Sequence, residues 1–182
     1  VRHNYDGNPC SHRKAHNIYG TQMARATYNG VKRFAYPKRP FIITRSAYSG
    51  AQRYTSSWTG DNVASWEHLW IANIQMQRMS MSGMGFTGSD IGGFAEQPSG
   101  ELYARWIQLG VFHPFCRTHS SGDHGEQEPW SFGEEVIDIT RKFVELRYQL
   151  LPYLYTMFWQ YIEEGIPMLK PLVYYDQEDI QT

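Results

Sequence analysis

The sequence predicts a parallel α/β fold with about four strands, which is half of an eight-stranded (β/α)8 barrel of the TIM type. Three observations indicate this fold. Short apolar segments with β-branched residues alternate with segments of helical periodicity. Each predicted strand runs into a polar or glycine-rich loop, and no internal repeat interrupts the alternation. A doubly wound open sheet fits the same pattern, so the pattern alone leaves both architectures open.

Four short segments have the composition of strands. Residues 41–44 form an apolar run that is typical of a buried strand, and residues 54–58 form a weaker candidate. Residues 84–87 lead into a glycine-rich stretch at residues 88–93. Residues 114–116 are the last candidate. We therefore expect the functional loops directly after these segments, because barrels of this class carry their chemistry there.

Helices are predicted between and after the strands. The first covers residues 16–29 and stops at Asn29 and Gly30. The second spans residues 66–79 behind a cap at Asp61, Asn62 or Ser65, and its apolar residues on more than one face predict a largely buried helix. A third helix is predicted over residues 99–112.

The last predicted helix is the longest. Ser131 and Glu134 form a capping-box pattern at its start. Apolar residues then recur at spacings of three and four. Pro152 is expected to kink the helix or to end its first segment, and Gly165 to stop it.

Composition and charge exclude several classes of function. The 182 residues contain 17 Lys and Arg against 18 Asp and Glu, a net charge of −1, which gives no field for nucleic acid or an anionic membrane. Two cysteines are too few for a disulfide-dense scaffold or a four-thiolate zinc site. No apolar run is long enough to cross a membrane. The two ends do not resemble natural termini, so we expect a piece of a longer protein, and the compartment stays open.

Two acidic residues lie in loops that suit an active site. Asp61 lies in the stretch WTGDN after a predicted strand, where it is either an active-site carboxylate or a simple helix cap. Asp90 lies in GSDIGG, whose glycines let the backbone approach a ligand closely. The alternative for Asp90 is a glycine-rich turn in which its carboxylate bonds its own backbone.

Basic and aromatic residues extend this set. Arg45 directly follows an apolar strand, so it either pairs with a carboxylate or points at ligand hydroxyls. Trp58 and Phe94 are candidate platforms for a sugar ring, although either one taken alone is more consistent with a core residue. A further cluster comprises His113, Cys116, His119 and His124, and it could be a metal site or a polar loop. Its spacing matches no standard zinc motif, so we predict no metal.

Several motifs occur in a fixed order along nearly the whole chain. Together they resemble glycoside hydrolase family 31, in its α-glucosidase branch. The motifs are RPFIITRS (39–46), QRY (52–54), WTGDN (58–62), TGSDIGGF (87–94), PFCRTH (114–119), EPW (128–130) and RYQLLPYLY (147–155). Their order and separations are far more specific than any single motif.

The resemblance implies roles for four polar residues. Asp61 matches the family's general acid/base. Arg45 and Asp90 match residues that hold the sugar in the −1 subsite. His119 matches a histidine that bonds hydroxyls of the same sugar.

The resemblance also implies the surroundings of that sugar. Arg117 matches a supporting arginine, and Trp58 and Phe94 match aromatic walls of the pocket. The family uses no metal or organic cofactor and releases glucose from the non-reducing ends of oligosaccharides with retention of configuration.

One essential part of the family is missing from the sequence. The nucleophile is an Asp in a Trp-x-Asp-Met-Asn-Glu type motif, and the chain contains no such motif. The resemblance therefore implies that residues 1–165 are the second half of the catalytic barrel and that residues 166–182 lead into a β-rich sandwich domain. We expect the partner of this chain to be the missing N-terminal half. Alone, the chain should be inactive and prone to aggregate or to form a homo-oligomer.

Two alternatives to an α-glucosidase stay open. Within the family, the runner-up is an α-xylosidase or a transglycosidase, because the groups that admit or exclude the 6-hydroxymethyl group lie mostly in the missing half, and transfer depends on water access and binding at the +1 subsite. In another class, the chain could be a sugar-binding or structural remnant without catalysis. Linkage and chain-length preference are not determined by these residues.

Overall fold

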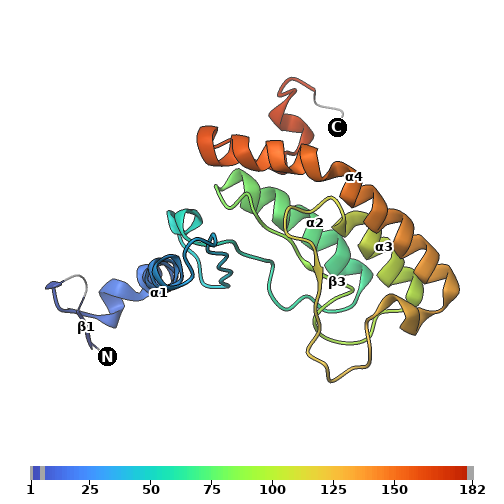
Figure 1. Cartoon of the computed structure of the whole chain (residues 1–182), viewed down its shortest axis with the longest axis horizontal. Coiled ribbons are helices and arrows are strands. Elements are labelled where there is room, and N and C mark those ends of the chain that lie inside the picture. The colour runs from blue at the N-terminus through green and yellow to red at the C-terminus, as the bar shows by residue number, and fades with distance from the viewer. Residues whose placement is uncertain (1, 5–6, 180–182) are drawn as a thin grey trace. The chain divides into compact units, whose positions relative to one another are not determined.

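In a computed structural model, residues 2–4 and 7–179 are described (Figure 1). The chain divides into two compact units, Val1–Ser57 and Trp58–Thr182. Within the described residues, no helix has both the length and the apolar character that a membrane crossing requires.

The first unit consists of a small hairpin and a long helix. Strand β1 (Arg2–His3) pairs antiparallel with β2 (Cys10–Ser11), and α1 (His12–Phe34) follows at once. The predicted stop at Asn29 and Gly30 is wrong, because the helix continues to Phe34. Gly30 does not adopt the left-handed backbone of a helix cap, and Lys32 and Arg33 favour the actual C-terminus through the helix dipole.

The two strands predicted in this unit are reduced to a single parallel bridge between Ile43 and Ser56. The Ser56 N–H donates to the Ile42 carbonyl at 2.9 Å, and the Thr44 N–H donates to the Ser56 carbonyl at 3.0 Å. The short helical turn η2 (Ala51–Arg53) lies between the two segments. Burial of the first segment was wrongly predicted, since Phe41 is 60% exposed.

The second unit alternates helices with a two-stranded parallel sheet, made of β3 (Asp90–Ile91) and β4 (Arg117–Thr118). Its other elements are α2 (Trp66–Met81), α3 (Gly100–Gly110), η3 (Pro129–Phe132), α4 (Glu134–Glu164) and η4 (Leu172–Tyr174). The parallel pairing is as predicted, but both strands begin just after the predicted segments. The predicted segments 84–87 and 114–116 are not strands, but a hydrogen bond joins them, from the Phe115 N–H to the Thr87 carbonyl at 3.0 Å.

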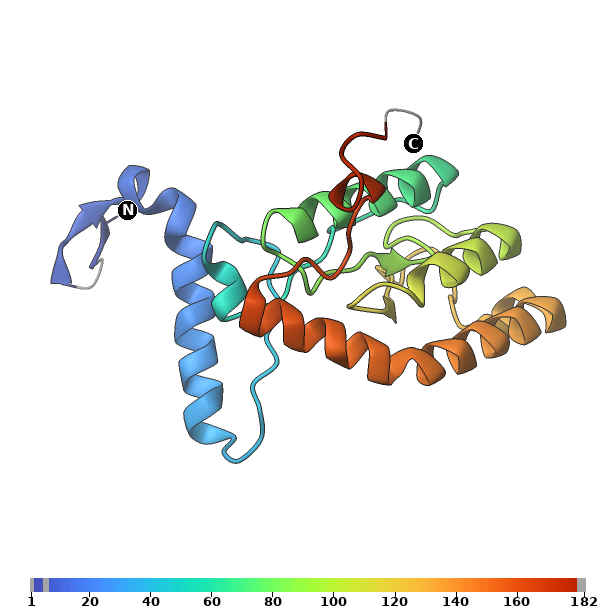
Figure 2. The same cartoon turned by 90° about the horizontal axis from the view of Figure 1, so that it is seen from above.

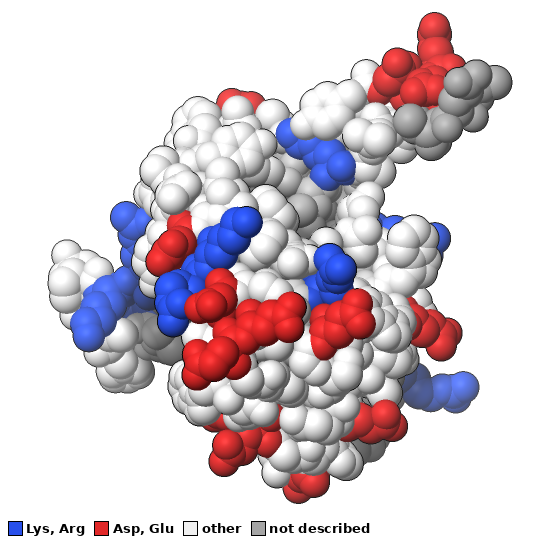
Figure 3. Space-filling model, turned by 90° about the vertical axis from the view of Figure 1, so that its right-hand side faces the viewer, with Lys and Arg blue, Asp and Glu red and all other residues white. Residues whose placement is uncertain are grey.

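Helices α2, α3 and α4 run in the same direction, with α3 between the other two (Figures 1 and 2). Ser65, one of the three predicted candidates, caps α2 by accepting a hydrogen bond from a backbone N–H group, and Ser99 caps α3 in the same way. Each first turn carries glutamate, which the positive end of the helix dipole favours. Figure 3 looks at this side of the molecule and shows acidic side chains gathered there, with basic ones beside them.

Helix α4 departs from one expectation and excludes one of the two outcomes expected at Pro152, the end of a segment. The Ser131–Glu134 capping box does not form, because Gly133 occupies the cap position and the Ser131 hydroxyl contacts Glu126 instead. Pro152 does not end a segment, since the helix runs through it for 31 residues in all. Gly165 ends the helix in a left-handed conformation, as predicted.

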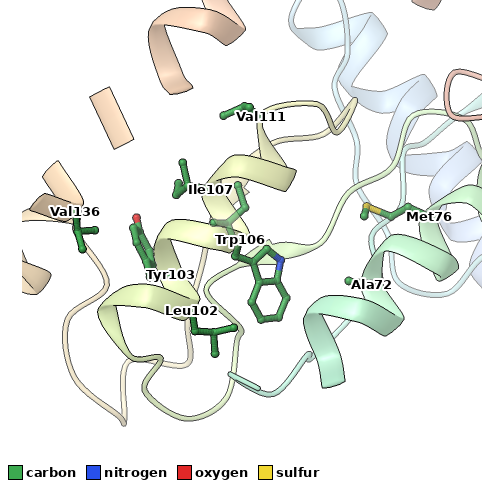
Figure 4. Packing of buried hydrophobic residues seen from close by; sticks show 9 residues of the cluster. Ala72, Met76, Leu102, Tyr103, Trp106, Ile107, Val111 and Val136 are labelled. Atoms are coloured by element: carbon green, nitrogen blue, oxygen red, sulfur yellow. The ribbon is translucent and has the colours of Figure 1, made fainter. Parts of the chain in front are cut away.

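The core lies between α2, α3 and the start of α4 (Figure 4). Trp106 extends from α3 toward Ala72 and Met76 of α2, and its indole N–H donates to the Ser89 hydroxyl at 3.0 Å. Helix α2 is less buried than predicted. Trp66 and Trp70 are 53% and 67% exposed, so only the α3-facing stripe of α2 contributes to the core.

Gly88 is required where the two strands approach each other. A Cβ atom at this position would lie 1.8 Å from the Phe115 carbonyl oxygen. We expect Gly88→Ala to push β3 and β4 apart and to lower the free energy of unfolding by about 3 kcal/mol. Thermal unfolding tests this, with Gly30→Ala as control, because a Cβ at Gly30 meets no atom within 4 Å. Equal melting temperatures for the two variants would contradict the steric argument.

Candidate active site

Three loops of the second unit meet at one end of the parallel helices. Each of these segments comes before a helix along the chain: residues 58–62 precede α2, residues 90–94, which begin with β3, precede α3, and residues 117–119, which begin with β4, precede η3 and α4. Backbone hydrogen bonds join the loops. The Phe94 N–H donates to the Asn62 carbonyl at 2.7 Å, and the Ser121 N–H donates to the Phe94 carbonyl at 2.9 Å. The candidate residues from distant parts of the sequence therefore come together.

An ion pair between neighbouring strands forms the centre of this site. Asp90 on β3 lies directly opposite Arg117 on β4, and the Arg117 Nε–H donates to Asp90 Oδ1 at 2.8 Å. The Asp90 side chain is fully buried, whereas that of Arg117 is 28% exposed. Asp90 Oδ2 is buried without a hydrogen-bond partner among the residues that the structure describes. The carboxylate thus has one oxygen bound to Arg117 and a second, buried oxygen without a partner in the described residues.

Five influences act on the pKa of the Asp90 carboxyl group. Burial raises its pKa above the ordinary value and is the largest influence. The hydrogen bond and charge of Arg117 lower this pKa, and so does the charge of His119. The carboxylate of Asp61 raises it by repulsion. Asp61 and His119 are therefore electrostatic neighbours of Asp90, although both side chains are exposed.

Aromatic rings border the ion pair. The Arg117 guanidinium lies 5.3 Å from the centroid of the Trp58 ring and 5.1 Å from that of Phe115. The rings of Phe94 and His119 lie 5.4 Å apart at 37°. Trp58 and Phe94 are half-buried, and the Trp58 indole nitrogen has no partner in the described part of the chain. Both residues are thus rings at the edge of the site.

The structure excludes one of the two interpretations of each acidic residue. Ser65 caps α2, so Asp61 is not the helix cap. The turn after Asp90 is rich in glycine, as expected, but the Asp90 carboxylate binds Arg117 and not its own backbone. Arg45 lies in the first unit, exposed, just after the Ile43–Ser56 bridge, whereas the other six candidate residues lie in the second unit.

Sequence reasoning missed Gln127, which supports the turn after β3. Gly92 and Gly93 have φ of 89° and 90°, and a Cβ on Gly93 would lie 2.6 Å from the Ala64 backbone. The buried Gln127 side chain donates from Nε2 to the Gly93 carbonyl at 3.0 Å. Nothing in the sequence indicates that a glutamine in a polar loop binds a backbone carbonyl 34 residues away.

The four residues that were considered as a metal site differ in burial. His113 is buried in the interior, Cys116 is half-buried, and His119 and His124 are exposed. No group of three or more His, Cys, Asp or Glu side chains is placed to hold a metal ion anywhere in residues 2–4 and 7–179.

His113 makes the stability of this unit depend on pH. Its ring is 2% exposed, and burial together with the nearby charge of Arg147 lowers its pKa to about 3. An unfolded histidine binds a proton near pH 6.5, so between these two values the unfolded state holds more protons than the folded state. We therefore expect stability to fall progressively, by a few kcal/mol, as the pH drops from about 6.5 toward 3.

The His113→Leu variant tests this directly. Melting temperatures of the wild type should decline below about pH 6.5 more steeply than those of the variant. His124→Leu, which changes an exposed histidine, should retain the wild-type slope. Identical pH slopes in wild type and His113→Leu would contradict the assignment.

Comparison with known proteins identifies the family. The family model described as "Glycosyl hydrolases family 31 TIM-barrel domain" matches residues 1–157. The chain belongs to this family. It is 46% identical over 182 residues to "Alpha-glucosidase 2" of Bacillus thermoamyloliquefaciens, covering all of this chain and 23% of that protein. It is 45% identical over 162 residues to "Glucosidase 2 subunit alpha" of Saccharomyces cerevisiae, covering 88% of this chain and 17% of that protein.

Solved structures of the family resemble the chain as well. The crystal structure of a family 31 α-glucosidase from Bacteroides thetaiotaomicron matches with a TM-score of 0.88 and 39% identity, over 95% of this chain and 29% of that protein. The predicted family and its TIM-barrel domain are thus confirmed. The chain spans less than a third of the length of each of these three relatives.

Proposed function

We propose that this chain supplies the general acid/base and much of the sugar-binding site of a retaining, exo-acting α-glucosidase. Its substrates are terminal α-linked glucose units of malto- or isomalto-oligosaccharides. The observation that carries the proposal is the buried Asp90 carboxylate, with one oxygen on Arg117, one oxygen unpaired, and Asp61 and His119 beside it. Relatives named α-glucosidase support the reaction class.

The −1 sugar is held by hydrogen bonds to its hydroxyl groups. Asp90 Oδ2 accepts from a hydroxyl, which is the bond that a buried unpaired carboxylate oxygen favours most. His119 and Arg117 contact the same sugar from β4 and the loop after it. Trp58 and Phe94 supply the aromatic walls. For Arg45, the resemblance to the family implies the role of a further charged donor to sugar hydroxyl groups.

Asp61 acts as the general acid and base. A retaining glycosidase needs two carboxyl groups about 5–5.5 Å apart. The nucleophile attacks the anomeric carbon while Asp61 gives its proton to the departing oxygen. Asp61 then takes a proton from the water that cleaves the glycosyl-enzyme, which restores both carboxyl groups. The exposure of Asp61 suits this role, because both the leaving group and water must reach it.

The nucleophile lies outside this chain, in a preceding segment of a longer polypeptide. We call that longer polypeptide the intact protein. In it, residues 1–165 form the second half of the barrel and residues 166–182 lead into a sandwich domain. The isolated 182-residue chain is therefore inactive.

A substrate panel tests the function. We expect the intact protein to hydrolyse an aryl α-glucoside and maltose, and the isolated chain to hydrolyse neither. Faster turnover of an aryl α-xyloside would identify an α-xylosidase. Longer oligosaccharides formed from maltose would identify a transglycosidase. Glucose binding by calorimetry without turnover of any substrate would favour a non-catalytic sugar-binding protein and would reject the proposal.

A further inference from the structure

Arg147 of α4 binds three backbone carbonyls of a single turn. Its Nη1 donates to the carbonyls of Val111 at 2.6 Å and His113 at 2.7 Å, and its Nη2 donates to that of Pro114 at 3.1 Å. Among the described residues, Arg147 forms no ion pair with a carboxylate. Its hydrogen bonds to these carbonyls therefore tie α4 to the backbone of the turn.

These carbonyls belong to the connection between α3 and β4. A helix leaves its last carbonyls without partners inside the helix and carries partial negative charge at that end. Helix α3 has no basic residue in its own last turn. Arg147 supplies a donor to the carbonyl of the cap residue Val111, and positive charge near this end of α3, from a different helix.

The same turn is also fixed from the inside. The side chains of Val111 and His113 are 1% and 2% exposed, and the Phe115 N–H donates to the Thr87 carbonyl at 3.0 Å. Arg117 follows only three residues after Pro114. A shift of the turn along β3 would therefore move Arg117 relative to Asp90 and break their 2.8 Å contact.

We propose that Arg147 is a positioning residue of the site: by clamping the turn at residues 111–114, it fixes β4 so that Arg117 and His119 face the sugar beside Asp90. Arg147 touches no substrate and acts only through the backbone. The effect on sugar binding rests on the proposed function, whereas the effect on β4 does not.

Enzyme kinetics of the intact protein test the first effect. We expect Arg147→Met to lower kcat/KM for an aryl α-glucoside by about 10–100-fold, because small misplacements of binding groups have effects of this size. The inhibition constant of glucose should rise, in assays well below the melting temperature. A merely structural role would lower the melting temperature and leave glucose inhibition unchanged.

Two further variants sharpen the comparison. Arg147→Lys should recover part of the loss, since one ammonium group keeps the charge but lacks the reach of two guanidinium nitrogens. It also serves as the test if Arg147→Met does not fold. Arg141→Met is the matched control, because Arg141 lies exposed on the same helix and pairs only with Asp138 at 2.6 Å. Values of kcat/KM for the Arg147 variants equal to those of this control would overturn the proposal.

Hydrogen exchange of the same proteins gives a readout that needs no activity. Arg147→Met should speed exchange of the Phe115 and Ser121 amides, which bond across to Thr87 and Phe94, and leave the amides of α2 unchanged. Unchanged exchange at these two amides would overturn the proposal. If the wild-type intact protein hydrolyses no glycoside, the proposed function fails, and the exchange result still decides whether Arg147 holds β4.

Discussion

Replacing Asp61 with asparagine should slow hydrolysis of maltose by the intact protein by about 10²–10⁴-fold, the usual contribution of a general acid and base. The asparagine keeps the size of the side chain but has no proton to give to the leaving oxygen. The loss in kcat/KM should nearly vanish for a dinitrophenyl α-glucoside, whose leaving group needs no proton. Steady-state kinetics on both substrates provide the measurement.

The control for this variant is Asp123→Asn, which changes an exposed carboxylate in the polar loop after β4. We expect it to hydrolyse both substrates at the wild-type rate. An Asp61→Asn enzyme with wild-type activity on maltose would show that another residue donates the proton. An equal loss on both substrates would assign Asp61 to binding and not to proton transfer.

Replacing Asp90 with asparagine should lower kcat/KM by about 10²-fold, because hydrogen bonds to a charged group are among the strongest in proteins. The asparagine cannot both accept from Arg117 and present a charged acceptor to a sugar hydroxyl. Glucose binding, measured by calorimetry, should weaken in parallel.

Asp138→Asn is the matched control, because it also removes one member of an Asp–Arg pair. The Asp138–Arg141 contact is 2.6 Å, but the Asp138 side chain is 71% exposed. An exposed pair contributes little to stability, so this variant should bind glucose and turn over substrate as the wild type does. Equal glucose affinity in Asp90→Asn and Asp138→Asn would contradict the proposed contact of Asp90 with the sugar.

Local signals in the sequence predicted the helices well. Ser65 and Ser99 cap α2 and α3 because a serine before an apolar periodic segment acts within a few residues. The cap predicted for α4 was wrong. Ser131 and Glu134 have the spacing of a capping box, but Gly133 occupies the cap position before the first residue of the helix. A side-chain pattern does not report the backbone conformation that a cap requires.

The strands were harder to place because their position depends on a distant partner. Strands β3 and β4 include the ion pair of Asp90 and Arg117, two charged residues 27 positions apart. Apolar composition instead directed the prediction to the segments just upstream. The parallel pairing itself was predictable, since it follows from the alternation of strands and helices.

Sequence motifs predicted the residues of the candidate site, but they did not predict Gln127 and Arg147, which support it. Asp61, Asp90 and His119 lie in loops whose glycine, aromatic and charged residues stand out in the sequence. Gln127 and Arg147 bind backbone carbonyls more than 30 residues away, and a carbonyl is common to every residue. Only the folded arrangement shows which carbonyls they contact.

Rescue of the Asp61→Asn intact protein by azide tests the central claim most directly. With dinitrophenyl α-glucoside as substrate, azide needs no general base and attacks the glycosyl-enzyme from the side that the leaving group has vacated. We predict a faster turnover and α-glucosyl azide as the product, identified by its anomeric proton in NMR. Formation of β-glucosyl azide would instead make Asp61 the nucleophile, and no acceleration by azide would contradict its role as the acid/base of a retaining enzyme.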